Sequence, residues 1–258
     1  MNDYQAPPHS LKDRVILVTG AGDGLGRAVA RAAAAQGASL ILLGRTTAKL
    51  EQVYDQIESD GSPQPAIFPL NLETAAANTY ADLADVIAEE FGALHGLVHC
   101  AAQLRLLSRI DDYDLETWNQ LLQVNLTAPF LLTQACLPLL KTADRSSLIF
   151  TSDSLGRRAK AYWGAYAVAK FGLEGLMQVL ADELESSPVR VNSIDPGPLR
   201  TNLRKTAYPA EDELQHPPPE SVTPAYLHLL GADGANIHGQ AISLSPQCLW
   251  SDQRHPGT

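Results

Sequence analysis

Cysteines and long apolar runs are scarce in this sequence, and each scarcity excludes a class of protein. The 258 residues include three cysteines, Cys100, Cys136 and Cys248, with no CxxC spacing. An odd number of separated cysteines argues against a disulfide framework and is typical of a reducing cytosol. No apolar run is long enough to span a bilayer, and the first residues, MNDYQAPPHSLKDR, lack the charged segment and apolar core of a secretory signal. We therefore expect a cytoplasmic protein without a membrane partner.

Positive charge is also scarce. The chain carries 19 lysines and arginines against 29 aspartates and glutamates, which gives a formal net charge of -10. No basic stripe is present, so nucleic acid is not an expected partner, and an anionic ligand would have to be held by a local arrangement. The seven histidines are scattered without the spacing of metal ligands, so we expect no metal site.

The sequence does contain a regular alternation of short apolar runs and helical patterns. Most of the runs are apolar at consecutive positions, as expected for strands that are covered on both faces. The pattern predicts an α/β fold in one domain, residues 1–258, with a Rossmann-like, doubly wound, seven-stranded parallel sheet and helices on both faces. The expected strands are 14–19, 38–43, 66–70, 96–100, 147–151, 189–194 and 237–244, and the expected helices include 27–36, 47–60, 74–91, 115–140 and one ending near 186.

Three segments interrupt this alternation. Residues 1–10 are polar and contain prolines, so we expect an arm. In the helical stretch 115–140, Pro129 and Pro138 predict a bend or a late end. Residues 200–223 have no clear periodicity, and such a segment is more often a binding loop than a passive connection, so we expect a substrate loop there.

A glycine-rich turn follows the first strand. The sequence Thr19-Gly-Ala-Gly-Asp-Gly-Leu-Gly26 connects that strand to an alanine-rich helix. Such a turn presents backbone N–H groups and the positive end of the helix to an anion. Gly20 allows the tight turn, Gly24 lets the backbone approach a pyrophosphate, and Gly26 lets the helix pack closely. We predict a dinucleotide site that includes Asp23 and Leu25.

The end of the second strand indicates which dinucleotide is bound. The chain reads Leu43-Gly44-Arg45 there, without the Asp or Glu that accepts a hydrogen bond from a free ribose 2′-hydroxyl. The Arg45 guanidinium is suited to a 2′-phosphate. This favours NADP, with NAD as the alternative. Asp23 favours NAD mildly, because a carboxylate near a 2′-phosphate is unfavourable.

Tyr166 and Lys170 are the candidate catalytic pair. They stand four residues apart in a helical pattern, so their side chains share one face of the helix. A nearby ammonium stabilises the phenolate, so we expect the lysine to lower the pKa of the tyrosine. Tyr166 would then donate and accept a proton near neutral pH.

Taken together, these motifs resemble the short-chain dehydrogenase/reductase family over about residues 11–244. Thr19, Gly20, Gly24 and Gly26 match its TGxxxGxG turn, and Tyr166 and Lys170 match its YxxxK pair. The segments VNLTAPF around Asn125, PGPLRT after Asp195, and IHGQAISL near residue 240 match three further family segments. Within the family, the stretch around Tyr166 is similar to bacterial YciK-type oxidoreductases.

The resemblance implies a role for each matching residue. Tyr166 would exchange a proton with the substrate oxygen, Lys170 would bind ribose hydroxyls, and Asn125 would kink its helix and position a water. Asn71 and Leu72 would flank the adenine, and Cys100-Ala101 would take the place of the family's Asn-Ala beside the cofactor. The residues implied at the nicotinamide half are Ile194, Pro196, Gly197 and Thr201.

Residue 153 departs from the family pattern. The family has a serine thirteen residues before the tyrosine, where this chain has Asp153 between Ser152 and Ser154. An ionised Asp has no proton to donate, would repel a developing alkoxide and would raise the pKa of Tyr166. Asp153 could be protonated, a flanking serine could replace the missing hydroxyl, or catalysis could be weak. We favour the serine substitute, which requires a turn or bulge because strand neighbours face opposite ways.

These features support two hypotheses from different functional classes. The first is an NADP-dependent oxidoreductase that acts on a small carbonyl or secondary alcohol. The alternative is a nucleotide-binding protein with little or no turnover, because of Asp153. The resemblance also implies a homodimer or homotetramer, formed through the long helices at 115–140 and 171–184.

Overall fold

One parallel sheet organises the structure, a computed structural model that describes residues 1 and 3–244. Its strand order is β3-β2-β1-β4-β5-β6-β7, and every neighbouring pair is parallel. This confirms the predicted seven-stranded sheet. The strands are β1 (Val15–Thr19), β2 (Ser39–Gly44), β3 (Ala66–Pro69), β4 (Gly96–His99), β5 (Ser146–Thr151), β6 (Val189–Asp195) and β7 (Ala241–Ser243).

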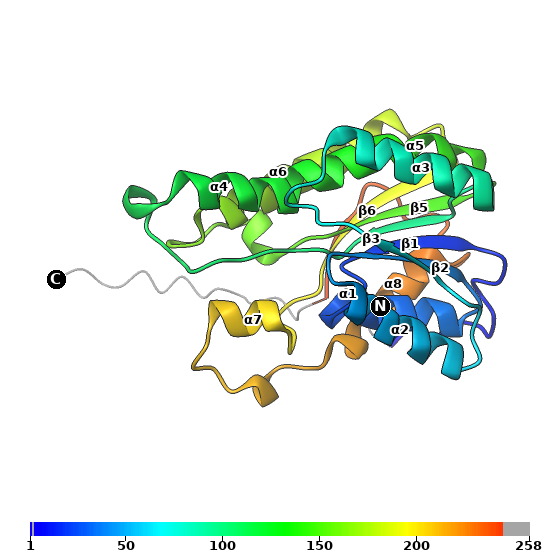
Figure 1. The fold of residues 1–258 in the computed structure, drawn as a ribbon, viewed down its shortest axis with the longest axis horizontal. Coiled ribbons are helices and arrows are strands. Elements are labelled where there is room, and N and C mark those ends of the chain that lie inside the picture. Colours follow the sequence, from blue (N-terminus) through cyan, green and yellow to red (C-terminus); the bar gives the residue numbers. More distant parts are fainter. Residues whose placement is uncertain (2, 245–258) are drawn as a thin grey trace.

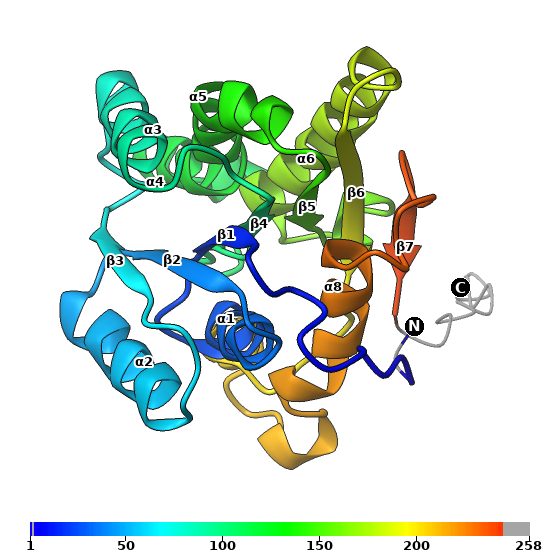
Figure 2. The same ribbon diagram turned by 90° about the vertical axis from the view of Figure 1, so that its right-hand side faces the viewer.

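Helices cover both faces of the sheet (Figure 2). One layer contains α1 (Gly24–Ala35), α2 (Thr47–Ser59) and α8 (Thr223–Leu230), and the other contains α3 (Ala77–Phe91), α4 (Leu115–Leu122), α5 (Ala128–Thr142) and α6 (Gly164–Glu183). Side chains alternate along β1, where Ile16 and Val18 pack toward the first layer and Val15 and Leu17 toward the second. Because both faces are buried, the strands are apolar at consecutive positions.

The strand order reverses beside β1, and this reversal places the site. The chain winds outward from β1 through β2 to β3 and then returns to β4 on the other side of β1. The loops that leave β1 and β4 therefore diverge to opposite faces and open a crevice at the carboxyl ends of the strands. In open α/β sheets this is where ligands bind.

The long helical stretch is interrupted just before Pro129, whereas Pro138 lies inside α5. A π-helical segment, Gln123–Thr127, separates α4 from α5, and both helices lie in the same layer in Figure 1. Pro129 lies in the first turn of α5 and has no N–H to donate to the carbonyl of Asn125. Within the π segment the side-chain amide of Asn125 donates to the carbonyl of Leu121 at 2.8 Å. A π segment of this kind is frequent at functional sites.

The last strand begins later in the structure than the sequence predicts. The expected range was 237–244, but β7 covers Ala241–Ser243. The N–H of Ile237 closes a turn on the carbonyl of Gly234, and Gly239 has a φ of +68°. A residue in the left-handed region cannot continue a strand, so pairing starts only after it.

The segment 200–223 and the helix after it contain structure that periodicity did not predict. They include α7 (Asn202–Ala207), 3₁₀ turns at Glu213–Gln215 and Pro219–Val222, and then α8. Each piece is shorter than the window over which helical periodicity can be recognised. Helix α8 is stable because it is buried against α1 rather than because of its own propensity.

The amino-terminal arm packs on the fold. The Tyr4 hydroxyl donates to Asp233 at 2.9 Å, and its ring meets that of His228 edge-on at 4.5 Å. Burial, followed by the Asp233 hydrogen bond, raises the pKa of Tyr4 to about 12. Cys248 lies outside the described residues. None of the helices within residues 1 and 3–244 has the length and hydropathy needed to cross a membrane.

Candidate active site

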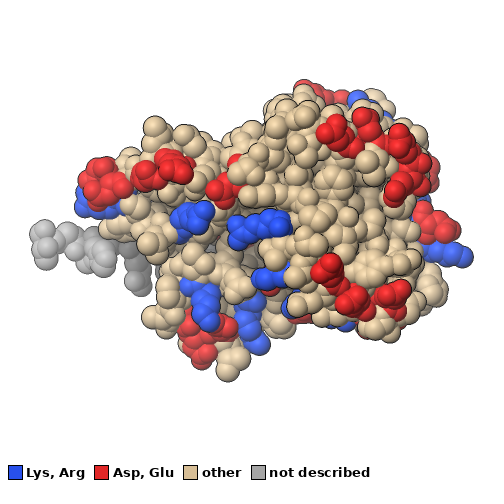
Figure 3. Space-filling view, viewed as in Figure 1, with Lys and Arg blue, Asp and Glu red and all other residues tan. Residues whose placement is uncertain are grey.

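A cleft of about 1320 Å³ lies at the carboxyl ends of the strands. In Figure 3 lysine and arginine side chains border the hollow in the middle of this face, while acidic side chains lie mainly toward the periphery. Asn125 and Ile194 are buried outside the lining. The predicted site residues that line the cleft are Gly20, Asp23, Gly24, Leu25, Gly26, Arg45, Asn71, Leu72, Cys100, Ala101, Ser152, Asp153, Ser154, Tyr166, Lys170, Pro196, Gly197 and Thr201.

The glycine turn has the shape of a phosphate cradle. Gly20 has a φ of +67°, and a Cβ there would lie 2.9 Å from the Cα of Ala101. A Cβ on Gly26 would overlap the carbonyl oxygen of Gly20. Both positions therefore require glycine, the first for the turn and the second for the helix contact. The turn leads into the amino terminus of α1, which borders the cleft and fits an anionic pyrophosphate.

Asp23 is neutralised by its neighbours. One carboxylate oxygen caps α1 by accepting from the N–H of Gly24 at 2.7 Å, and the other accepts from Lys49 at 2.6 Å and Asn202 at 2.9 Å. Burial tends to raise the pKa of Asp23, but the hydrogen bonds from Lys49 and Gly24 outweigh burial and lower it. The carboxylate thus opposes a 2′-phosphate less than the sequence suggested.

Two cations face the end of the cleft beyond the glycine turn. Arg45 is exposed just after β2, and Lys49 projects from the first turns of α2. Sequence reasoning found Arg45 and missed Lys49, although a second basic residue four positions later was the available signal. Asn71 and Leu72, which follow β3, line the same cleft. Leu72 is buried, and the Asn71 side chain accepts a hydrogen bond from the N–H of Glu73 at 3.2 Å.

Thr19 holds the segment after β4, where this chain has Cys100 in place of the expected asparagine. The Thr19 hydroxyl oxygen accepts from the N–H groups of Cys100 and Ala101 at 3.1 and 3.0 Å. These bonds hold the ends of β1 and β4 together where the cleft opens. Burial raises the pKa of Cys100 to about 12, so the thiol stays protonated.

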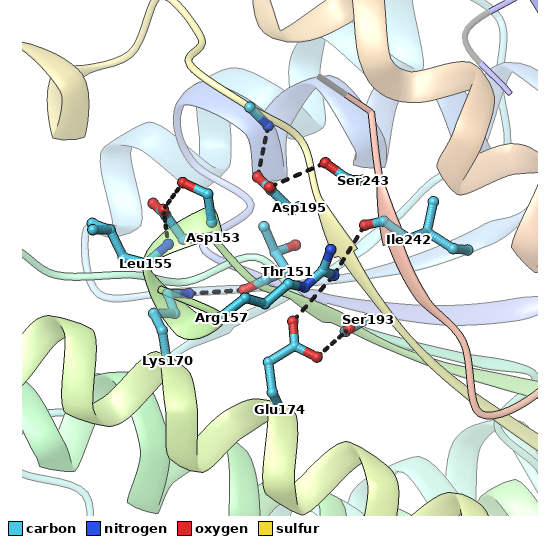
Figure 4. Close-up of polar contacts among 12 residues, drawn as sticks. Thr151, Asp153, Leu155, Arg157, Lys170, Glu174, Ser193, Asp195, Ile242 and Ser243 are labelled. Carbon is cyan, nitrogen blue, oxygen red and sulfur yellow. Dashed lines mark hydrogen bonds and ion pairs between the residues drawn. The ribbon is translucent and has the colours of Figure 1, made fainter. Parts of the chain in front are cut away.

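Tyr166 and Lys170 converge at the end of β5. Both are 2 % exposed, and the Lys170 ammonium lies 5.6 Å from the centre of the Tyr166 ring. Lys170 donates to the carbonyl oxygen of Thr151 at 2.8 Å, which fixes its position (Figure 4). The shared helical face predicted from their spacing is therefore observed.

The expected effect of the lysine on the tyrosine is not observed. Burial is the largest influence on Tyr166, the charge of Asp153 adds to it, and together they raise the pKa of Tyr166 well above its usual value. Burial also lowers the pKa of Lys170. The prediction of a lowered tyrosine pKa was wrong for this structure, because desolvation disfavours a phenolate more than one ammonium stabilises it.

Asp153, not a flanking serine, faces Tyr166. Strand β5 ends at Thr151, and a turn follows, in which the Tyr166 hydroxyl donates to Asp153 at 3.3 Å. The other oxygen of Asp153 accepts from the N–H of Leu155 at 2.9 Å. The Ser154 hydroxyl donates to Asp153 at 3.3 Å, while the Ser152 hydroxyl is buried without a partner among the described residues. The turn that a serine substitute would require is present, but it directs the Asp153 carboxylate, and not a serine hydroxyl, at Tyr166.

A second carboxylate lies at the end of β6. Asp195 is 4 % exposed and accepts from the N–H of Gly197 at 3.0 Å and from Ser243 at 3.3 Å (Figure 4). Burial and then the nearby charge of Asp153 raise its pKa, although the Gly197 bond opposes them. Thr201 caps α7 by accepting from the N–H of Arg204 at 3.3 Å. This turn joins the sheet to segment 200–223.

Aromatic rings form the wall beyond Tyr166. The ring of Trp163 lies 5.6 Å from that of Tyr166 and 6.1 Å from that of Tyr208. Sequence reasoning missed Tyr208, because it belongs to segment 200–223 and has no positional relation to the motifs. Arg204 lies 4.1 Å over the Tyr208 ring and pairs with Glu211 at 2.6 Å.

Comparison with known proteins agrees with this geometry. A sequence profile of the short chain dehydrogenases matches residues 14–212. The chain belongs to the short-chain dehydrogenase/reductase family. It is 44 % identical to the uncharacterized oxidoreductase YciK of Escherichia coli K12 over 243 residues, 94 % of this chain and 96 % of YciK. This confirms the resemblance to YciK-type proteins, and the family's oxidoreductase activity is favoured over the alternative of a nucleotide-binding protein without turnover.

Solved short-chain dehydrogenase structures match the fold closely. One from Pseudomonas syringae is 52 % identical, covers 93 % of this chain and 98 % of its own, and superimposes with a TM-score of 0.92. One from E. coli CFT073, solved with NADPH, is 44 % identical, covers 93 % and 100 %, and has a TM-score of 0.90. One from Shigella flexneri, solved with NADP, is 43 % identical, covers 92 % and 99 %, and has a TM-score of 0.89.

Within this short-chain dehydrogenase, Asn125 acts on the loop after β4. Its amide donates to the carbonyl of Gln103 at 2.8 Å, and its oxygen accepts from the N–H of Gln103 at 3.0 Å. Gln103 in turn donates to Glu73 at 3.1 Å. Asn125 therefore holds the cleft lining from behind. Among the described residues, no group of three His, Cys, Asp or Glu side chains could hold a metal ion.

Proposed function

We propose that the protein is an NADP-dependent oxidoreductase that transfers hydride between nicotinamide and a carbonyl or secondary alcohol. Tyr166 exchanges the proton and Lys170 supports it. The observation that carries this proposal is that the Tyr166–Lys170 pair and the glycine turn open into the same cleft. The cofactor cradle and the proton-transfer group thus lie in one cavity, at the carboxyl ends of the strands.

The cleft offers a place for each part of NADP. The glycine turn and the start of α1 suit the pyrophosphate, Arg45 and Lys49 suit the 2′-phosphate, and Asn71-Leu72 flanks the adenine. Pro196, Gly197 and Thr201 would contact the nicotinamide half. Relatives with over 40 % identity were solved with NADP or NADPH, which supports the choice over NAD. When bound, the cofactor supplies or accepts hydride.

The residues of the chain supply position and a proton. Tyr166 holds a proton on its hydroxyl, and its burial excludes water from the transfer. Lys170 is fixed on the carbonyl of Thr151, and in this proposal it binds the ribose hydroxyls. Asn125 holds the lining in place through Gln103. In this proposal residues 1–258 act as one domain, and segment 200–223 covers the substrate.

The test is NADPH oxidation by the purified protein with a panel of ketones and aldehydes, alongside titration with NADPH and NADH. We expect NADPH to bind more tightly than NADH and to be consumed with part of the panel. Tighter binding of NADH would refute the role of Arg45. NADPH binding without turnover of any panel member would refute the proposed hydride transfer to carbonyl compounds.

We also propose that the protein is a homodimer or homotetramer. Val168, Phe171 and Val179 recur at helical spacing on the outer face of α6 and are 47 %, 45 % and 55 % exposed. Phe130 of α5 is 43 % exposed. Exposed apolar faces of this kind mark protein–protein contacts. Phe171→Glu should reduce the mass measured by sedimentation or light scattering, and an unchanged mass would exclude this face as the contact.

A further inference from the structure

Asp153 lies where a hydrogen-bond donor to substrate oxygen would be expected. We propose that the double bond preferred at this site is carbon–nitrogen, as in a cyclic imine, and that the Asp153 carboxylate accepts a hydrogen bond from the protonated nitrogen. This inference rests on the proposed NADPH-dependent hydride transfer. It changes the atom that is protonated, while Tyr166 and the cofactor cleft keep their roles.

The carboxylate is held so that one oxygen faces the reacting position. The N–H of Leu155, at 2.9 Å, and the Ser154 hydroxyl, at 3.3 Å, both bond to Oδ1. The Tyr166 hydroxyl bonds to Oδ2 at 3.3 Å. Oδ2 therefore lies beside the proton-transfer group with spare acceptor capacity, since a carboxylate oxygen has two lone pairs.

Among the described residues neither flanking hydroxyl bonds to Tyr166, which bonds to Asp153. Ser152 is 4 % exposed and its hydroxyl has no partner among the described residues, and Ser154 points its hydroxyl at Asp153 itself. The group beside Tyr166 is thus an acceptor. A substrate atom that carries hydrogen satisfies it, whereas a carbonyl oxygen does not.

The charge that develops during reduction distinguishes the two double bonds. Reduction of a ketone builds negative charge on oxygen, which the Asp153 carboxylate would repel. A protonated imine begins with positive charge on nitrogen, which the carboxylate attracts and hydrogen-bonds. Asp195 adds a second carboxylate near the first, at the end of the neighbouring strand β6 (Figure 4). Asp153 and Asp195 both act on the charge of Lys170, so two carboxylates stand beside one buried ammonium at this end of the cleft.

The aromatic wall suits the same kind of ligand. The ring of Trp163 lies between those of Tyr166 and Tyr208 in this wall, with its centre 5.6 Å from the first and 6.1 Å from the second. Aromatic rings pack against flat apolar groups and attract cations at their faces. The guanidinium of Arg204, over Tyr208, is neutralised by Glu211 at 2.6 Å, so it opposes a cationic ring less.

The reaction balances with NADPH as reductant. The imine carbon gains a hydride with its electron pair, and NADPH becomes NADP⁺. The nitrogen arrives protonated from solution or receives the Tyr166 hydroxyl proton, which solvent restores after the product has left. The carbon–nitrogen double bond becomes a single bond, so an imine, NADPH and one proton yield an amine and NADP⁺.

The test compares two bicyclic compounds of the same size with the purified full-length chain and NADPH. One is 3,4-dihydroisoquinoline, which carries C=N, and the other is α-tetralone, which carries C=O. We expect kcat/KM for the imine to exceed that for the ketone by about tenfold or more, the factor that a hydrogen bond to a charged group supplies. Asp153→Ser should lower this ratio by about the same factor.

A control and a binding measurement keep the inference falsifiable. Asp82→Asn removes a carboxylate from the exposed face of α3 and should leave the ratio unchanged. Calorimetry with NADP⁺ present should show the product amine, tetrahydroisoquinoline, binding more tightly than α-tetralol, and Asp153→Asn should remove the difference. A ketone preference, an unchanged ratio in Asp153→Ser, or equal binding of amine and alcohol would overturn the inference. Tyr166-dependent turnover of the ketone would still support the proposed function.

Discussion

The two halves of the cleft use the chain differently. The cofactor half is built from backbone: the glycine turn, the start of α1 and the ends of β1 and β4, with Thr19 joining the last two. The substrate half is built from side chains of α6, of the turn after β5 and of segment 200–223. A site made of backbone depends on glycine positions, which a motif records. A site made of side chains depends on partners that the motif does not record.

The two carboxylates that the sequence marked as unfavourable show the same contrast. Asp23, in the cofactor half, is neutralised by Lys49 and capped onto α1. Asp153, in the substrate half, bonds to Leu155, Ser154 and Tyr166, and forms no salt bridge within the part of the chain that the structure describes. Neutralised, the first accommodates a phosphate. The second lies beside the Tyr166 hydroxyl without a cationic partner among the described residues, and in the inference above it selects the substrate.

The largest effect should come from the substrate half. Tyr166→Phe removes the hydroxyl that exchanges the proton, so we expect kcat to fall by about 10²–10⁴-fold. Because the ring stays, NADPH affinity should be nearly unchanged. Stopped-flow turnover and NADPH fluorescence titration measure the two quantities. If NADPH affinity fell by the same factor as kcat, Tyr166 would belong to the cofactor half of the cleft as well as to the substrate half.

A glycine substitution should damage the cofactor half. In Gly26→Ala the new methyl would overlap the carbonyl of Gly20, so we expect unfolding free energy to fall by about 1–3 kcal/mol and NADPH affinity to fall with it. The matched control is Gly175→Ala on α6, where a Cβ meets nothing within 4 Å. That change should be neutral or stabilising by up to about 1 kcal/mol. Equal effects of the two substitutions on NADPH titration would contradict the cradle.

Cofactor choice should respond to substitution of Arg45. Arg45→Ala removes a charged partner of the 2′-phosphate, and we expect NADPH affinity to fall about tenfold or more, with NADH affinity unchanged. Lys141→Ala, at the exposed end of α5, serves as the charge-matched control. A parallel fall for NADH would assign Arg45 to general electrostatic attraction instead.

The smallest effect should be a loosening of segment 200–223 in acid. The hydrogen bond from Arg204 lowers the pKa of Glu211 to about 2. Desolvation opposes this shift, and the hydrogen bond from His216 adds to it. A lowered carboxyl pKa contributes stability that is present above its unfolded value of 4.5 and is lost as pH falls through the folded value. Protection of the segment 200–223 amides, measured against their intrinsic exchange rate at each pH, should therefore decrease as pH falls from 4.5 toward 2. Glu211→Gln should weaken this pH dependence.

Sequence reasoning predicted the fold and the positions of the motifs for identifiable reasons. Buried parallel strands need consecutive apolar residues, and the 3.6-residue period places Tyr166 and Lys170 on one face. It missed α7, α8 and Tyr208, because short helices form by packing on other elements and leave little periodic signal. It also overestimated the influence of Lys170, because the cost of burying Tyr166 exists only once the surrounding core is assembled.

The sequence by itself determined the parallel sheet, the glycine turn and the helical face that Tyr166 and Lys170 share, because each depends on local spacing or on the absence of a side chain. The tertiary structure decided which charged side chains have a neutralising partner. It brought Lys49 and Asn202, from two other elements, onto Asp23. It turned the chain after β5 so that Asp153, rather than Ser152 or Ser154, meets Tyr166. Such outcomes depend on distances between segments far apart in the chain, which spacing along the sequence cannot specify.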